Sequence, residues 1–131
     1  MGKLMNAREY EESLRKLNLK VYQFGRRVTN VVDDQIIRPS MNAVAATYEC
    51  AHKPEYEDLM TTTSHITGKK INRFTHIHQS AEDLVKKSKM GRLLGSLTAC
   101  CFQRCVGMDA MNALSITTYA IDQKYGTEYY K

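Results

Sequence analysis

Two cysteines four residues apart are the part of this sequence best suited to bind a metal. Cys101 and Cys105 frame the run CFQRC. On an α-helix this spacing puts both side chains on one face, about 6 Å apart along the axis, so both sulfurs can reach one ion or cluster. Small, polarisable cysteines also fill crowded helix interfaces, and the spacing alone slightly favours that alternative.

Further ligands close to this pair are scarce. An iron–sulfur cluster normally takes four ligands, usually cysteines, and Cys100 points about a third of a turn away from the shared face. A zinc site needs a second pair of ligands, for which His76 and His78 are the candidates. Isolated histidines are more often surface or hydrogen-bonded groups, so zinc is the weaker alternative. The missing ligands of any cluster must come from elsewhere.

Other catalytic patterns are absent from the sequence. It contains no Gly-rich phosphate loop, no Ser-His-Asp arrangement and no HExxH metal helix. Arg104 and Asp109 lie in an apolar stretch, and we expect them to form a buried polar pair rather than an acid or base. Chemistry in this chain therefore centres on the cysteines.

The net charge raises the question of an anionic partner. Nineteen Lys and Arg against fourteen Asp and Glu give +5. The basic residues are scattered, and the nearest approach to a cluster is Lys86, Lys87, Lys89 and Arg92. Nucleic-acid binding usually shows a sustained basic run or face. We therefore expect no nucleic acid, and favour a solvated helix face or a phosphate-bearing ligand.

Capping and apolar spacing predict the first helices. Asn6 with Glu9 predicts a helix running to about Leu17. Residues 19–32 are rich in β-branched and aromatic side chains, which indicates an extended stretch interrupted by a glycine. Ser40 is expected to cap a helix over residues 41–52 that ends before a proline.

The second half predicts longer helices. Residues 55–60 suggest a helical turn, and residues 61–71 a loop or strand. Ser80 is a strong helix start, with acids in the first turn. Residues 96–121 are apolar on nearly every side, which predicts one buried helix. Its polar residues make a membrane span the poorer interpretation.

Size and composition limit the class of protein. The chain has 131 residues, 43% hydrophobic and 25% charged, which is the composition of one globular domain. Such a length supplies few neighbours to surround a fully buried helix. We therefore expect a portion of a larger protein or an obligate oligomer. The N-terminus resembles no targeting segment, so a cytoplasmic location with reduced cysteines is expected.

The cysteine-containing segment has a recognisable relative. The run TACCFQRCVGMDAMNA closely resembles the cluster-binding helix of the 4-hydroxybutyryl-CoA dehydratases, a branch of the flavin-dependent 4-hydroxyphenylacetate 3-hydroxylase family. The similarity extends along nearly the whole chain, through EYEESLRKLNLKVYQFG, IIRPSMNAVAATYE, YEDLMTTTSHITGKKINRF, HQSAEDLVKK, KMGRLLG and AIDQKYGTEYYK.

This resemblance implies a mainly α fold. Residues 1–131 would be the N-terminal helical domain of an acyl-CoA dehydrogenase-like fold, with a short extended stretch near residues 19–32. The central β domain and the C-terminal helical domain of the family would be absent. Ordinary hydroxylases of the family lack the paired cysteines, so Cys101 and Cys105 favour the dehydratase branch.

The resemblance also implies cofactors and a reaction. Cys101 and Cys105 would hold a 4Fe-4S cluster together with a histidine and a cysteine from later in the chain. With FAD, the complete enzyme would convert 4-hydroxybutyryl-CoA to crotonyl-CoA and isomerise vinylacetyl-CoA. Arg92 and Gln103 match family positions near the active site, where they would tune the cluster or contact an anion; packing and surface solvation are the alternative.

The implied partners follow from the missing domains. They are the remainder of the enzyme or a complementary chain, an acyl-CoA substrate, and further copies of the protein, since the family forms tetramers. The chain alone would be inactive, whether it is a truncated chain, a fragment or a split gene product. Two rival hypotheses are a non-catalytic helical oligomerisation module and a segment of a 4-hydroxyphenylacetate 3-hydroxylase-like monooxygenase.

Overall fold

The fold is mainly helical, as the sequence predicts, with two small antiparallel hairpins. A computed structural model describes residues 3–99 and 104–130. In chain order its elements are α1 (Ala7–Arg15), β1 (Val21–Gln23), β2 (Arg26–Val28), α2 (Arg38–Cys50), the 3-10 turn η1 (Pro54–Tyr56), α3 (Glu57–Met60), β3 (Thr61–Thr63), β4 (Lys70–Asn72), the 3-10 turn η2 (Arg73–Thr75), α4 (Ala81–Thr98) and α5 (Arg104–Tyr125).

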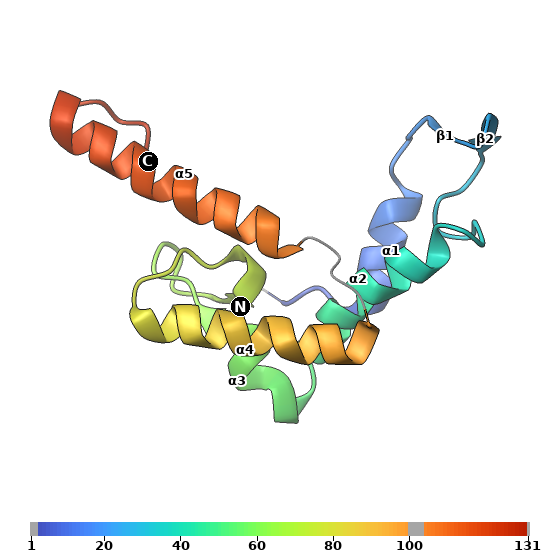
Figure 1. Cartoon of the computed structure of the whole chain (residues 1–131), viewed down its shortest axis with the longest axis horizontal. Coiled ribbons are helices and arrows are strands. Elements are labelled where there is room, and N and C mark those ends of the chain that lie inside the picture. The colour runs from blue at the N-terminus through green and yellow to red at the C-terminus, as the bar shows by residue number, and fades with distance from the viewer. Residues whose placement is uncertain (1–2, 100–103, 131) are drawn as a thin grey trace.

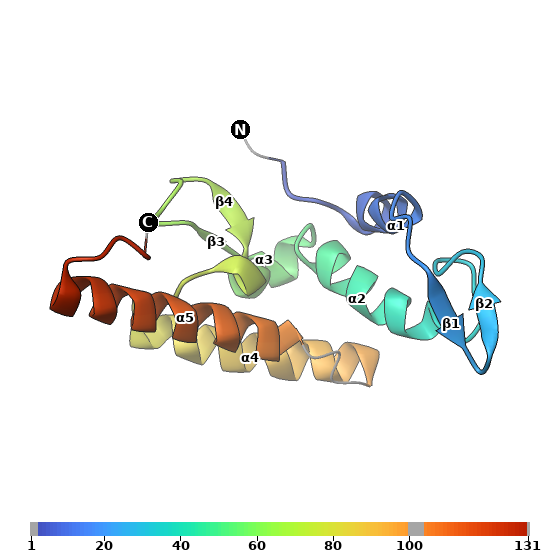
Figure 2. The ribbon, with the colours of Figure 1, turned by 90° about the horizontal axis from the view of Figure 1, so that it is seen from above.

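The elements form an elongated molecule. Helices α1 and α2 pack together at one end, next to the β1–β2 hairpin, while the C-terminal part of α5 lies at the opposite end (Figure 1 and Figure 2). Between them, α4 lies against α3, and α5 contacts η2. Helix α5 runs over α4 and diverges from it towards the C-terminus (Figure 1).

Helix α1 begins where the sequence predicts. The backbone N–H of Glu9 donates to Asn6 Oδ1 at 2.9 Å, and the Asn6 N–H donates to Glu9 Oε2 at 3.0 Å. This reciprocal pair satisfies two helix N–H groups that have no intrahelical partner. The Tyr10 ring stacks on Tyr48 with 4.8 Å between centroids, which joins α1 to α2.

The extended stretch of residues 19–32 is a β-hairpin. Strand β1 pairs antiparallel with β2, and Val21 lies opposite Val28. The turn residues Phe24 and Gly25 both have positive φ, +49° and +78°. Two-residue hairpin turns favour this conformation because it matches the twist of the strands. The glycine that interrupts the pattern is therefore the turn itself.

The predicted start of α2 is wrong by three residues. The helix begins at Arg38, so Ser40 lies inside it and does not cap it. Pro39 occupies the first turn, where its missing N–H costs nothing because the helix offers that position no acceptor. Asp34 Oδ1 instead accepts from the N–H groups of Ile36 and Ile37 just before the helix.

The middle of the chain forms the short elements that the sequence indicates. The helical turn expected at residues 55–60 corresponds to η1 followed by α3. The expected loop or strand is the β3–β4 hairpin, in which Thr61 lies opposite Asn72. Helix α4 then starts at the predicted cap, since Ser80 and Asp83 form a second reciprocal capping pair.

The expectation of one continuous helix over residues 96–121 is wrong. Helix α4 ends at Thr98, and Ala99 adopts a left-handed conformation with φ +51°. A left-handed residue turns the chain away from the helix axis and ends the hydrogen-bond pattern. Helix α5 begins separately at Arg104.

The core gathers side chains from four helices and η2. Its buried residues are Cys50, Ala51, Met60, Phe74, Met90, Leu94 and Met108. Of the α5 side chains that the structure describes, only Met108 and Asn112 are buried. The expectation that this helix is buried all round is therefore wrong for the described residues, because nothing among them covers its outer face. Within the described ranges, no helix is long and apolar enough to cross a bilayer.

Candidate functional site

The candidate site centres on Cys105, in the first turn of α5. Its side chain is half-buried. Backbone N–H groups in a first helical turn have no intrahelical acceptor, which favours negative charge there. A metal-bound thiolate suits that position. Cys101 and Gln103, the other predicted site residues of this segment, lie outside the described residues, as does Cys100.

The remaining described cysteine belongs to the core. Cys50 is 3% exposed and packs among the apolar residues around Met60. Burial raises the pKa of its thiol, so it stays protonated and does not resemble a metal ligand. Of the two thiols that the structure describes, Cys105 is therefore the more accessible.

Arg92 lies on the exposed side of α4. It lines an open hollow of about 320 Å³ together with Leu84, Val85, Ser88 and Lys89. None of these lining residues comes from α5. Arg92 is therefore accessible and lies beside apolar side chains and a lysine. Among the described residues, no cavity contains both Arg92 and Cys105.

Within the described part of the chain, two of the four basic residues of α4 form ion pairs. Lys86 Nζ lies 2.6 Å from Asp58 Oδ1, and Lys87 pairs with Asp109 of α5. The Asp109 side chain is 57% exposed. Asp109 was predicted to form a buried pair with Arg104, and this prediction is wrong for Asp109, which is exposed and pairs with a lysine of the neighbouring helix. The side chain of Arg104 lies outside the described residues. A solvated helix face accounts for these lysines.

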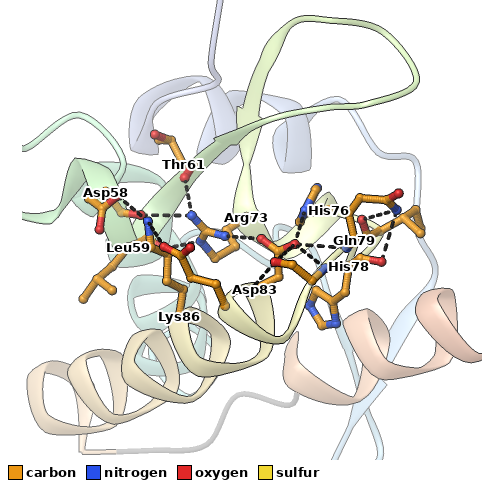
Figure 3. Close-up of polar contacts among 12 residues, drawn as sticks. Asp58, Leu59, Thr61, Arg73, His76, His78, Gln79, Asp83 and Lys86 are labelled. Carbon is orange, nitrogen blue, oxygen red and sulfur yellow. Dashed lines mark hydrogen bonds and ion pairs between the residues drawn. The ribbon is translucent and has the colours of Figure 1, made fainter.

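Arg73 lies at the centre of a buried polar network (Figure 3). Its side chain is 3% exposed. Nε donates to the Leu59 carbonyl at 2.8 Å, and Nη2 donates to the carbonyls of Asp58 at 3.0 Å and Thr61 at 2.9 Å. Nη1 lies 3.3 Å from Asp83 Oδ1. This one guanidinium therefore ties α3 and β3 to the start of α4.

Asp83 is the partner of several donors in the same network. Its Oδ2 accepts from the N–H groups of Gln79 at 3.0 Å and Ser80 at 3.2 Å, and lies 3.3 Å from His76 Nε2. Burial by itself would raise the pKa of Asp83, but these donors outweigh it and hold the pKa at about 2. Asp83 is therefore a structural anion, ionised across the physiological range.

Of the two histidines considered as zinc ligands, His76 belongs to this network. The rings of His76 and His78 are 6.1 Å apart and inclined at 63°, and His76 contacts Asp83. Burial lowers the pKa of His78, which favours the neutral ring. Across residues 3–99 and 104–130, no group of three or more His, Cys, Asp or Glu side chains is arranged to hold a metal ion.

Asn112 links α5 to the segment that carries these histidines. Its Oδ1 accepts from the His78 N–H at 2.7 Å, and its Nδ2 donates to the carbonyls of His76 at 3.1 Å and Met108 at 2.9 Å. No role was predicted for this residue from the sequence. The available signal was an amide side chain in an otherwise apolar helix, which needs partners when buried.

A hollow of about 380 Å³ lies beside His78. It is formed by residues 77–79, the middle of α5 and the C-terminal segment, and is lined by Ile77, His78, Gln79, Ser115, Ile116, Tyr119 and Tyr130. The rings of Tyr119 and Tyr130 meet edge to face, 5.6 Å apart. The hollow shares none of these residues with the first turn of α5, so it is separate from Cys105.

Comparisons with known proteins show the family to which the chain is similar. Residues 6–131 match the model of the 4-hydroxyphenylacetate 3-hydroxylase N-terminal family. The chain is 64% identical over 128 residues to the 4-hydroxybutyryl-CoA dehydratase/vinylacetyl-CoA Δ-isomerase of Clostridium aminobutyricum, covering 98% of this chain and 26% of that protein.

A solved structure shows the same fold. This chain is similar to the solved structure of the oxygen-tolerant archaeal 4-hydroxybutyryl-CoA dehydratase from N. maritimus, with a TM-score of 0.90 and 55% sequence identity. The match covers 98% of this chain and 25% of the chain in that structure. The chain thus spans about a quarter of the length of both relatives.

Proposed function

Because this chain belongs to the 4-hydroxyphenylacetate 3-hydroxylase N-terminal family, we propose that it is the N-terminal helical domain of a 4-hydroxybutyryl-CoA dehydratase. The observation that carries this proposal is the 64% identity to such an enzyme over 98% of the chain. Residues 1–131 then form one domain, and the central β and C-terminal helical domains of an acyl-CoA dehydrogenase-like fold lie in the rest of the enzyme.

The proposed reaction converts 4-hydroxybutyryl-CoA to crotonyl-CoA, with isomerisation of vinylacetyl-CoA. When bound, FAD supplies one-electron oxidation that acidifies the substrate, and a 4Fe-4S cluster supplies a Lewis-acidic iron for the departing hydroxyl. Cys101 and Cys105 hold the cluster. Arg92 and Gln103 contact an anion or adjust the surroundings of the cluster. The half-buried thiol of Cys105 in the first turn of α5 supports this assignment.

The exposed apolar side chains of α5 support a large partner. Large apolar side chains of this helix stay more than half exposed, namely Val106, Leu114, Ile116, Tyr119 and Tyr125. These side chains lie on several sides of the helix, and Ile116 and Tyr119 continue the face that carries Cys105 and Asn112. Exposed apolar side chains in such number usually mark an interface. We assign it to the remainder of the enzyme, present either on the same polypeptide or on a complementary chain.

Activity then depends on that remainder. It supplies the other cluster ligands and most contacts to FAD and acyl-CoA, so the 131 residues alone are inactive. The complete enzyme is expected to form a homotetramer, as the family does, and to be located in the cytoplasm.

The decisive experiment measures iron in the assembled enzyme. The chain is produced without air together with the remaining domains, and iron per chain is compared with that of a Cys101→Ala/Cys105→Ala variant. We expect the unchanged protein to be brown and the double variant to lose its iron. Cys100→Ala is the matched control, since it removes the neighbouring thiol and should leave iron unchanged.

Three outcomes would contradict the proposal. Unchanged iron in the double variant would remove the cysteines from the cluster. Flavin binding and hydroxylation without iron would favour a monooxygenase. A stable, metal-free oligomer that binds neither flavin nor iron would favour a non-catalytic helical module.

A further inference from the structure

Helix α5 is held in place by few buried groups. Of its described side chains only Met108 and Asn112 are buried, and its large apolar residues mostly stay exposed. A helix with so little packing needs directional contacts to fix its rotation about its own axis. Hydrogen bonds supply such direction because they weaken steeply when misaligned.

The inward side of α5 is one helical face. Cys105, Met108, Asp109 and Asn112 follow the spacing i, i+3, i+4, i+7, which places them on the same side of a helix. Met108 enters the core, Asp109 pairs with Lys87 of α4, and Asn112 binds the 76–78 segment. Any rotation of α5 that breaks the contacts of Asn112 therefore also turns Cys105 away from its present direction.

The partner of Asn112 is itself fixed. The segment from His76 to His78 connects η2 to α4. Asp83 in the first turn of α4 holds it, through His76 Nε2 and the Gln79 N–H, and Arg73 holds Asp83 in turn (Figure 3). Asn112 thus bonds to a backbone segment that a buried ionic network keeps in place.

We propose that Asn112 is a positioning residue for Cys105. Its amide bonds to both the N–H of His78 and the carbonyl of His76, which sets the rotation of α5 and with it the direction of the Cys105 thiol. The chemical importance of this role rests on the proposed function, because only there does Cys105 serve as a cluster ligand.

The test measures how fast each thiol of the metal-free 131-residue chain is alkylated by iodoacetamide, with peptide mass spectrometry assigning rates to individual cysteines. Asn112→Leu keeps the size of the side chain and removes its hydrogen bonds. Thr117→Leu is the matched control, an exposed position of the same helix. Cys50 reports on the core, and Cys105 reports on α5.

We expect Asn112→Leu to change the alkylation rate of Cys105 by about tenfold while that of Cys50 stays the same, since two buried backbone groups lose their partner. Thr117→Leu should change neither rate. Equal acceleration of both thiols in Asn112→Leu would overturn the proposal, because the residue would then only support the fold. No change at Cys105 would overturn it as well, as would fast, equal reaction of both thiols in the unchanged chain.

Failure of the proposed function is distinguishable from failure of this positioning role. If Cys105 responds to Asn112→Leu while the double cysteine variant of the assembled enzyme keeps its iron, Asn112 positions the thiol as proposed, but the cluster assignment is wrong.

Discussion

Arg73 and Asp83 form a nearly buried ion pair, with 3.3 Å between Nη1 and Oδ1 and side-chain exposures of 3% and 15%. Each charge has further partners, three carbonyls for the arginine and two backbone N–H groups for the aspartate. A buried charge is tolerated when its hydrogen bonds are complete. This pair therefore joins α3, β3 and the start of α4 into one unit.

Removing the arginine should be strongly destabilising. Arg73→Met leaves Asp83 without its cation and three carbonyls without their donor, which should lower the free energy of unfolding by about 3 kcal/mol. Urea unfolding followed by circular dichroism measures this. Arg27→Met, at an exposed position on β2, is the control and should change stability by less than about 0.5 kcal/mol. Similar values for the two variants would contradict the role of the network.

Asp83 should give the chain an acid-sensitive component of stability. Its pKa is about 2 when folded, against an ordinary value of 3.8, so the unfolded chain takes up the proton first as the pH falls. The stabilisation is complete above about pH 4 to 5, is lost as the pH falls through the folded pKa, and amounts to about 2 kcal/mol. Asp83→Asn should lack it, as measured by urea unfolding between pH 6 and 2.

The matched control for this pH dependence is Asp58→Asn. The hydrogen bond from Lys86 also lowers the pKa of Asp58, but the Asp58 side chain is 79% exposed. Solvent screens an exposed pair, so its contribution is small. An equal loss of acid sensitivity in both variants would show that burial of Asp83 does not matter.

The two candidate caps should differ in their effect on stability. Ser80→Ala removes the side chain that accepts from the Asp83 N–H at the start of α4, and should cost about 1 kcal/mol. Ser40 lies inside α2 at an exposed position, where alanine is the better helix former. Ser40→Ala should therefore change the free energy of unfolding by less than about 0.5 kcal/mol or raise it. Thermal unfolding of the two variants checks this. The reverse order would restore Ser40 as the cap.

The buried side of α4 should carry most of its packing energy. Leu94 is 1% exposed and lies in the core, whereas Leu97 is 50% exposed. Leu94→Ala should therefore cost about 2 to 5 kcal/mol, because it removes buried area and leaves a cavity. Leu97→Ala should cost less than about 1 kcal/mol in the isolated chain. If Leu97→Ala proves as costly as Leu94→Ala, that face is covered in solution.

Local chemistry explains the predictions that succeed. The starts of α1 and α4 depend on Asn6 with Glu9 and on Ser80 with Asp83, partners only three residues apart. Within the predicted extended stretch, the turn itself was not predicted; it depends on Gly25, which adopts positive φ readily. Such interactions depend on neighbouring residues, so they can be recognised in the sequence without knowing the fold.

Distant contacts explain the pairings that were wrongly predicted or missed. Asp109 was expected near Arg104, yet it pairs with Lys87, 22 residues away in the chain. The partners of Asn112 lie 34 and 36 residues earlier. No short-range pattern encodes these pairings.

The amino-acid sequence by itself determined the family, the helical character and the pair of cysteines on which the proposed chemistry depends, because side-chain type and spacing are properties of the chain. Only the tertiary structure decided that α4 and α5 are separate helices, and that Asn112 and the Arg73–Asp83 pair fix the direction in which Cys105 points. Those relationships exist only after folding, when residues far apart in the chain exclude water together and must satisfy one another's hydrogen bonds.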